Sequence, residues 1–161
     1  MRALIWITEN TWRACIDEAG EVLGDGAEVA LLHVAATDVE ELVAGGRAGL
    51  LGRRPPRHPG PPPQAISDEE AQALLEAARD RLGRPAQLIA RRGRTEREVL
   101  EACADTDLLV MARDGERRLG PPSLGPRTRF VLDHAPCRVL LVWASPPPGL
   151  DTLRLPPHLR S

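Results

Sequence analysis

The chain has 161 residues, of which 42% are apolar and 27% charged, so it is long enough to bury the core of one globular domain. A net charge of -2 gives no reason to expect nucleic acid or an anionic membrane as a partner. No apolar run approaches the roughly 20 residues of a membrane span, and the run at 3–7 is too short for a signal peptide. We therefore expect a cytoplasmic protein that interacts with neither nucleic acid nor membrane.

Two residue types exclude further classes. All 21 basic residues are arginine, so a P-loop NTPase, a Schiff-base enzyme and a response-regulator receiver, which all need a lysine, are excluded. Cys15, Cys103 and Cys137 are odd in number and far apart, which argues against a disulfide framework or a zinc site. We expect them to be small buried apolar side chains, and we predict neither a metal site nor a catalytic residue.

The first elements in the chain read strand, helix, strand. Residues 3–7 form a continuous apolar run, and a polar turn at 8–11 precedes a helix. One face of that helix carries apolar residues at helical spacing, namely Trp12, Cys15, Ile16, Ala19, Val22 and Leu23. Gly24 closes the helix, and residues 28–34 are a second strand. Such short connections suit a right-handed crossover in a parallel sheet.

Residues 44–65 interrupt this rhythm with a crowd of Gly, Pro and Arg, and we expect a mobile loop there. One interpretation is a solvated insertion between strand and helix. The other is a basic, polyproline-like arm that binds an acidic or proline-binding protein partner.

The middle of the chain predicts helix, strand and helix. Ser67 with Glu70 has the spacing of a capping box, and the helix that follows ends at Gly83. Residues 86–90 are a third strand. Thr95 with Glu98 predicts a second capping box, before a helix that reaches Cys103.

The last third reads strand, long loop, helix, strand. Residues 107–111 are a buried strand, and the Gly, Pro and Arg of 112–125 predict an irregular loop. Gly125 as N-cap and Pro126 as first helical residue open a short helix, on which we expect Phe130, Val131 and His134 to share a face. Residues 138–143 form a fifth strand, and the Pro-rich segment 145–161 is expected to be extended or disordered. Five strands alternating with four helices predict an α/β fold with a doubly wound parallel sheet.

The stretch 107–143 resembles the end of a universal stress protein domain. In that family a strand is followed by glycine, two residues, glycine, nine residues, and then glycine with Ser or Thr. Ala112 stands at the first glycine, Gly115 and Gly125 keep the nine-residue spacing, and Pro126 stands at the hydroxyl position. The runs at 134–143 and 31–34 also look like that family.

The resemblance implies a domain over 1–144, with strand order 3-2-1-4-5 and a ligand site where the first and fourth strands separate. In nucleotide-binding members the glycine loop wraps phosphates, as at any helix N-terminus that binds an anion. The family usually has an aspartate where this chain has Thr8, and the backbone of Val34 would meet the adenine. The last strand, 138–143, is an apolar sheet edge that members commonly pair in a homodimer.

The candidate site for a nucleotide or another anion therefore comprises Thr8, Val34, Ala112, Gly115, Gly125, Pro126 and Arg127. Pro126 lacks both an amide and a hydroxyl at the phosphate position, which costs roughly 3 to 6 kcal/mol of binding if each donor is worth about 1.5 to 3. Against this loss stand five arginines that give the loop a net positive charge, Arg113, Arg117, Arg118, Arg127 and Arg129.

Three functions stay open. The first is a regulatory stress-response dimer with an altered or lost adenine-nucleotide site, without turnover and without a required cofactor. The second is a universal stress protein that binds ATP and hydrolyses it slowly. The third is an interaction module with no small-molecule ligand.

Overall fold

A computed structural model describes residues 1–36 and 68–154. The predicted insertion 44–65, the cap residue Ser67 and the end of the tail lie outside the described residues. The strands are β1 (Arg2–Trp6), β2 (Glu28–Ala36), β3 (Gln87–Gly93), β4 (Leu108–Arg113) and β5 (Arg138–Trp143). The helices are α1 (Trp12–Val22), α3 (Asp68–Leu82), α4 (Thr95–Ala102) and α5 (Pro126–His134), and the short 3-10 turns are η1 (Pro121–Ser123) and η2 (Leu150–Thr152).

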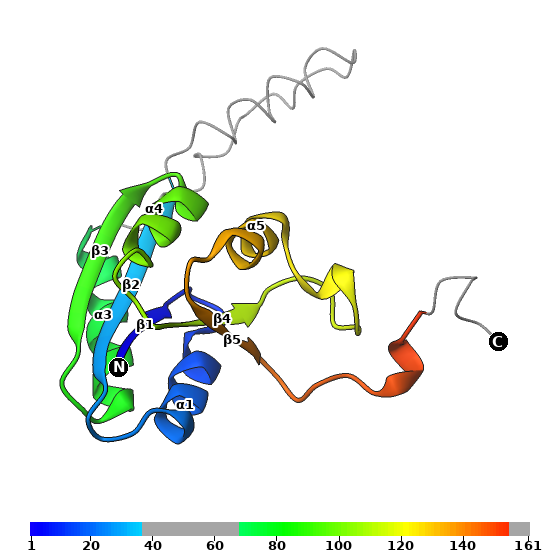
Figure 1. Ribbon diagram of the computed structural model, residues 1–161, viewed down its shortest axis with the longest axis horizontal. Coiled ribbons are helices and arrows are strands. Elements are labelled where there is room, and N and C mark those ends of the chain that lie inside the picture. The colour runs from blue at the N-terminus through cyan, green and yellow to red at the C-terminus, as the bar shows by residue number, and fades with distance from the viewer. Residues whose placement is uncertain (37–67, 155–161) are drawn as a thin grey trace, which may run out of the picture.

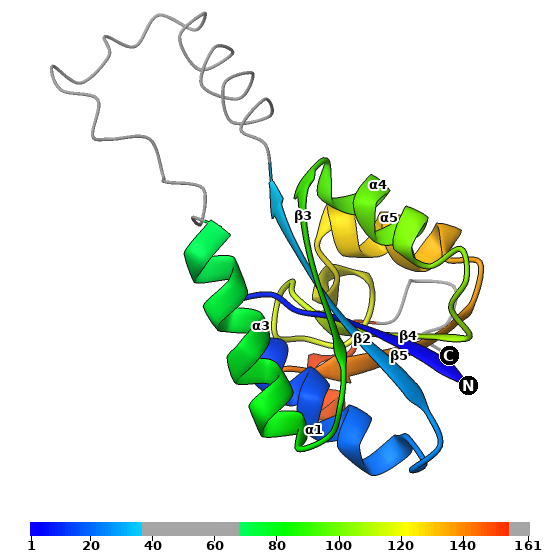
Figure 2. The same ribbon diagram turned by 90° about the vertical axis from the view of Figure 1, so that its left-hand side faces the viewer.

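The five strands form one parallel sheet in the order β3-β2-β1-β4-β5, which confirms the predicted doubly wound α/β fold. Helices α1 and α3 cover one face, and α4 and α5 cover the other (Figure 1; Figure 2). Because the chain reverses direction across the sheet between β1 and β4, the loops after these two strands diverge at the carboxyl edge.

Two apolar cores result, one on each face of the sheet. Leu31, Ile5, Val110 and Leu140 lie level with one another across four strands and contact the side of α1 and α3. Leu4 and Leu109 are level one residue earlier and face α4 and α5. Successive residues of the inner strands are thus buried on opposite faces, which explains why their sequences are continuous apolar runs.

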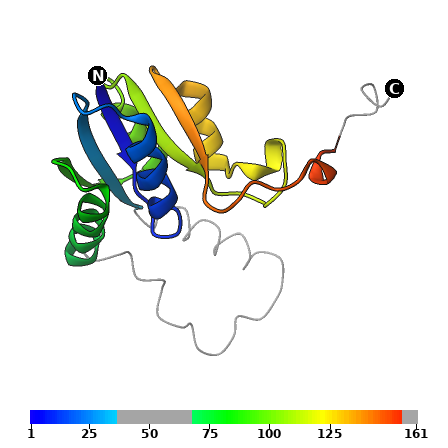
Figure 3. The same ribbon diagram turned by 90° about the horizontal axis from the view of Figure 1, so that it is seen from below.

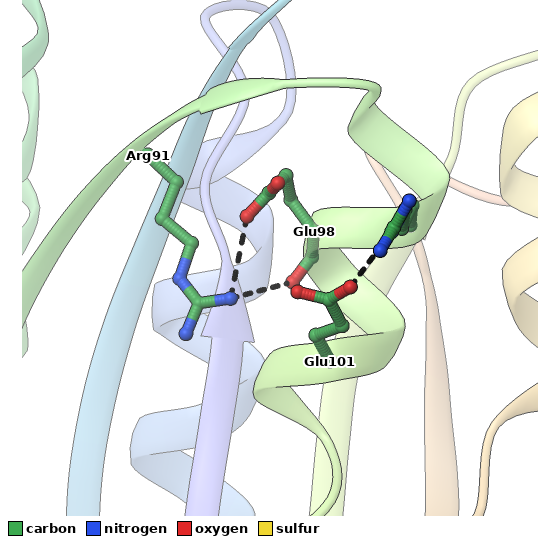
Figure 4. Close-up of polar contacts among 4 residues, drawn as sticks. Arg91, Glu98 and Glu101 are labelled. Atoms are coloured by element: carbon green, nitrogen blue, oxygen red, sulfur yellow. Dashed lines mark hydrogen bonds and ion pairs between the residues drawn. The ribbon is translucent and has the colours of Figure 1, made fainter.

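The predicted capping box at the start of α4 is wrong. Arg94 is the N-cap, its side chain makes no capping hydrogen bond, and Thr95 is already helical. Glu98 instead binds the neighbouring strand, where its carboxylate and backbone oxygen accept from Arg91 at 3.3 and 3.4 Å (Figure 4). Gly93 makes room for this contact, since a Cβ there would lie 2.9 Å from the Glu98 carboxylate. On the same helix Glu101 accepts from Arg97 at 2.7 Å.

Two predicted helix faces also need correction. Val22, the last residue of α1, is 53% exposed, whereas Leu23, the C-cap residue, is buried. Of the three residues predicted to share a face of α5, only Val131 is buried in the core. Phe130 is exposed and stacks on the His134 ring at a centroid distance of 4.1 Å.

Candidate functional site

The predicted site residues gather at the carboxyl edge of the sheet but have different roles. Val34 is buried in β2 beneath α4 and α5. Thr8 follows β1, and its hydroxyl lies 2.6 Å from that of Thr11. The predicted loop begins too early, because Ala112 is buried and still pairs with Val142 in the ladder between β4 and β5.

A carboxylate of the chain itself occupies the amino end of α5. Asp114 Oδ1 accepts the backbone N–H of Gly125, the N-cap residue, at 2.7 Å. Its Oδ2 accepts the hydroxyl of Thr128, also at 2.7 Å. A helix N-terminus attracts an anion through its free amides and its dipole. Here that anion is the side chain of Asp114, a residue of the same chain. A phosphate at the same place would have to displace Asp114, and it would meet a like charge.

The backbone of the glycine loop is hydrogen-bonded to itself. Gly115 N donates to Ser123 O at 3.0 Å, and Glu116 N donates to Pro122 O at 2.8 Å. Gly115 is required for this fold, since a Cβ there would lie 2.3 Å from the oxygen of Pro122. Amides that could wrap a phosphate are therefore used to fold the loop back on η1.

Arginines predicted to attract an anion are built into the loop instead. Arg113 donates to Ser123 Oγ, and its guanidinium lies 4.8 Å from the Trp143 ring centroid. Arg129 donates to Pro121 O at 2.9 Å. The two arginines at the tip of the loop are engaged as well, Arg118 with Glu116 at 3.0 Å and Arg117 with Pro146 O at 3.2 Å.

The segment after β5 also contacts the loop. Leu119 N donates to Thr152 Oγ1 at 3.2 Å, and that hydroxyl donates to Gly149 O at 2.7 Å, which closes turn η2. The loop with η1 and the segment with η2 run together away from the sheet (Figure 1; Figure 3). Residues 145–154 thus help to hold the loop in its folded form.

A pocket of about 530 Å³ opens between the amino ends of α4 and α5. Its lining residues are Arg94, Glu96, Asp114, Pro126, Arg127 and Phe130. The lining includes two arginines and two carboxylates, so their formal charges cancel. A highly charged anion such as ATP therefore gains little electrostatic attraction from these residues.

Glu96 is the buried charge of this pocket, with 8% of its surface exposed. Burial alone would raise the pKa of its carboxyl, but its own backbone N–H and the guanidinium groups of Arg94 and Arg127 outweigh burial and lower that pKa. Oε1 accepts from Arg94, while Oε2 is buried without a hydrogen-bond partner among the described residues. Glu96 is therefore a carboxylate at neutral pH.

Of the predicted site residues, Pro126 and Arg127 line the pocket, whereas Thr8, Val34, Ala112, Gly115 and Gly125 are not among its lining residues. Sequence patterns did not identify Arg94, Glu96 or the capping role of Asp114. The sequence contained a signal for Asp114, because this acidic residue directly precedes Gly115 in a loop that leads to the start of a helix, where an anion is favoured. None was available for Glu96, because its burial depends on how α4 packs against α5.

The two histidines in the described part of the chain each lie close to a backbone oxygen. His33 Nδ1 lies 2.9 Å from Ile7 O, and His134 Nδ1 lies 2.7 Å from Phe130 O. No cluster of three or more potential metal ligands occurs within 1–36 and 68–154. No helix in those ranges is long and apolar enough to cross a membrane.

The fold has counterparts among solved structures. The hypothetical protein MJ0577 superposes with a TM-score of 0.59 at 21% identity, over 88% of this chain and 94% of that one. A universal stress protein in complex with cAMP gives a TM-score of 0.58 at 16% identity, over 90% and 98%. The universal stress protein UspA from Lactobacillus plantarum gives 0.56 at 15% identity, over 88% and 97%.

Sequence comparison is more selective than these distant structural matches. No curated protein sequence matches the chain. The model of the universal stress protein family matches residues 13–142, which is most of the chain. That span runs from the first turn of α1 into β5 and includes the glycine loop, so the chain belongs to the universal stress protein family.

Proposed function

We propose that this chain is a regulatory universal stress protein without turnover of its own, whose adenine-nucleotide site is closed by Asp114. The observation that carries the proposal is the carboxylate of Asp114 on Gly125 N and the Thr128 hydroxyl, each at 2.7 Å. A loop that already holds an anion is folded without a ligand. Its surface is then available to a protein partner at any nucleotide concentration.

Three further features support a lost phosphate site. Pro126, the first residue of α5, has no N–H to donate. The amides of Gly115 and Glu116 are paired within the loop. The pocket beside α5 is lined by equal numbers of positive and negative side chains. Each feature removes a favourable contribution to phosphate binding, and none of them depends on the others.

A second candidate is retained binding of a less charged adenine nucleotide. The pocket volume of about 530 Å³ is in the range of small-molecule sites, and Phe130 offers an exposed ring at its edge. A structurally similar universal stress protein is known in complex with cAMP. A cyclic nucleotide carries one negative charge, so the electroneutral lining would weaken its binding less than that of ATP.

We further propose that the functional unit is a homodimer formed through β5. Among the described strands β3 and β5 are the two sheet edges. β3 carries Arg91 and Arg92, charges of the kind that prevent edge-to-edge pairing, whereas β5 is apolar from Val139 to Trp143. β5 is therefore the edge that favours pairing with a second copy.

Thermal unfolding with and without nucleotide tests the proposed site. The protein is heated alone and with millimolar ATP, ADP, AMP or cAMP. We expect ATP to leave the unfolding midpoint unchanged. A ligand present at 100 times its Kd would add about 2.7 kcal/mol to the free energy of unfolding and raise the midpoint by several degrees. A rise of that size with ATP would contradict the closed site, and a rise with cAMP alone would favour the second candidate.

A further inference from the structure

The charges that line the pocket between α4 and α5 differ in depth. The side chain of Glu96 is only 10% exposed, whereas that of Arg94 is 70% exposed. Arg127 and Asp114 are exposed residues as well. Water and salt screen an exposed charge strongly and a buried charge much less. The formal charges cancel in sum, but a ligand that enters the pocket meets a negative charge at its most buried point.

One oxygen of that buried carboxylate is unused. Oε1 of Glu96 accepts from Arg94, and Oε2 has no hydrogen-bond partner in the part of the chain that the structure describes. A buried acceptor without a partner is costly, so a donor that reaches it is bound favourably. The terminal torsion of a glutamate is soft, which lets the carboxylate turn Oε2 towards a donor in the pocket. Glu96 therefore favours a ligand with N–H groups, and a cationic one most of all.

Two further lining residues suit the same kind of ligand. Asp114 accepts one hydrogen bond at each oxygen, from Gly125 N and from the Thr128 hydroxyl, and a carboxylate oxygen can accept two. Phe130 is 45% exposed, and His134 stacks on its ring at a centroid distance of 4.1 Å. The face of an aromatic ring attracts cations and other flat rings. The pocket thus combines two acceptors with an aromatic surface.

We propose that this pocket binds a small amidinium or guanidinium compound, with an N–H group on Glu96 Oε2 and a flat face against the Phe130 ring. Such a group is planar, cationic and rich in N–H donors, and it stacks on aromatic rings. The pocket volume of about 530 Å³ is in the range of small-molecule sites. The proposal does not depend on whether the glycine loop binds ATP.

Other charged groups fit these contacts less well. An ammonium group is compact and strongly hydrated, and it has no flat face to stack. A carboxylate or a phosphate would bring a negative charge close to Glu96 and Asp114. The affinity of the pocket should accordingly follow the charge of the ligand, with the cation bound best.

Three probes that share one ring test the class of ligand on the full chain. Benzamidine, benzamide and benzoate carry a cationic, a neutral and an anionic group on the same phenyl ring. Each is titrated at pH 7 against isotope-labelled protein, and the NMR shifts of the Glu96 and Phe130 backbone amides report binding. We expect benzamidine to bind at least about tenfold more tightly than benzamide, and benzoate to bind least. Equal affinities, tighter binding of benzoate, or no shift with millimolar benzamidine would overturn the proposal.

Glu96→Gln tests the residue that carries the proposal. It keeps the size of the side chain and removes its charge, so benzamidine should bind at least about tenfold more weakly and lose its advantage over benzamide. Glu101→Gln is the matched control, because Glu101 is a carboxylate of the same helix that accepts from Arg97 at 2.7 Å and does not line the pocket (Figure 4). It should bind benzamidine as the wild type does.

Phe130→Leu tests the aromatic surface. It keeps an apolar side chain but removes the ring, so benzamidine and benzamide should both bind more weakly. Unchanged binding of benzamidine by both Glu96→Gln and Phe130→Leu would overturn the proposed site. The comparison of the three probes on the wild type decides the ligand class even if either variant folds poorly.

Discussion

Asp114 has two roles: it is the anion at the start of α5, and it anchors the glycine loop to that helix. Replacing it with Ala removes the acceptor for Gly125 N and the Thr128 hydroxyl. We expect a loss of about 1 kcal/mol in the free energy of unfolding, the usual size of an N-cap contribution. Urea denaturation measures this loss of stability.

Asp133→Ala is the control, because Asp133 is exposed near the carboxyl end of the same helix, where a negative charge is unfavourable. An equal loss in both variants would contradict the capping role.

Glu96 gives the stability a defined pH dependence. Its folded pKa lies below the ordinary value of 4.5, so its ionised form stabilises the fold above that value. The contribution is lost as pH falls through the lowered folded pKa. We expect Glu96→Gln to cost roughly 1 to 2 kcal/mol at pH 7 and progressively less as the pH drops below about 4. Urea denaturation across this range checks it, and a cost that grows towards acid pH would have the wrong sign.

At the scale of elements, the sequence predicted what depends on local pattern. Continuous apolar runs identified all five strands, and helical spacing identified the four helices, because each pattern reports directly on which faces are buried. The start of α5 was predicted to the residue from Gly125 and Pro126, whose backbone constraints act locally. Local pattern did not predict the contacts of side chains that bind residues in another element.

Two misses share that cause. Glu98 had the spacing of a capping residue but pairs with Arg91 across the turn from β3 to α4. The loop arginines were counted as charges available to a ligand, yet Arg113 is directed to Ser123 and Trp143. Spacing in the chain carries no information about such contacts.

The folded form of the glycine loop requires a residue without a side chain at position 115. Gly115→Ala would place a Cβ 2.3 Å from Pro122 O and 2.7 Å from the carbonyl carbon of Ser123, so the backbone must move apart. We expect this variant to lose roughly 1 to 3 kcal/mol, the usual cost of overpacking. Gly26→Ala is the matched control, since a Cβ there meets nothing within 4 Å. Thermal unfolding of both compares them, and equal midpoints would show that the loop refolds without cost.

At the scale of the whole molecule, the two sheet edges differ in chemistry. The arginines of β3 oppose pairing, and the apolar β5 favours it. We expect sedimentation equilibrium at tens of micromolar to give twice the chain mass of 17.5 kDa. A mass of 17.5 kDa at that concentration would rule out a stable dimer through β5.

Restoring the family motif alone should be insufficient to restore phosphate binding. Thr8→Asp, Ala112→Gly and Pro126→Ser would return the carboxylate, the glycine and the hydroxyl that the resemblance implies. They would leave Asp114 on the amino end of α5. Recovery of phosphate binding should therefore require removal of Asp114 as well.

Titration calorimetry with ATP tests this most directly, using the wild type, the triple variant and the triple variant with Asp114→Gly. We expect the wild type to bind no tighter than roughly millimolar, about -4 kcal/mol. The fourth substitution should improve the affinity of the triple variant at least about tenfold, or 1.4 kcal/mol, because it frees the amide of Gly125 and removes a like charge. Micromolar binding of ATP by the wild type, unchanged by the loss of Asp114, would contradict a site closed by its own carboxylate.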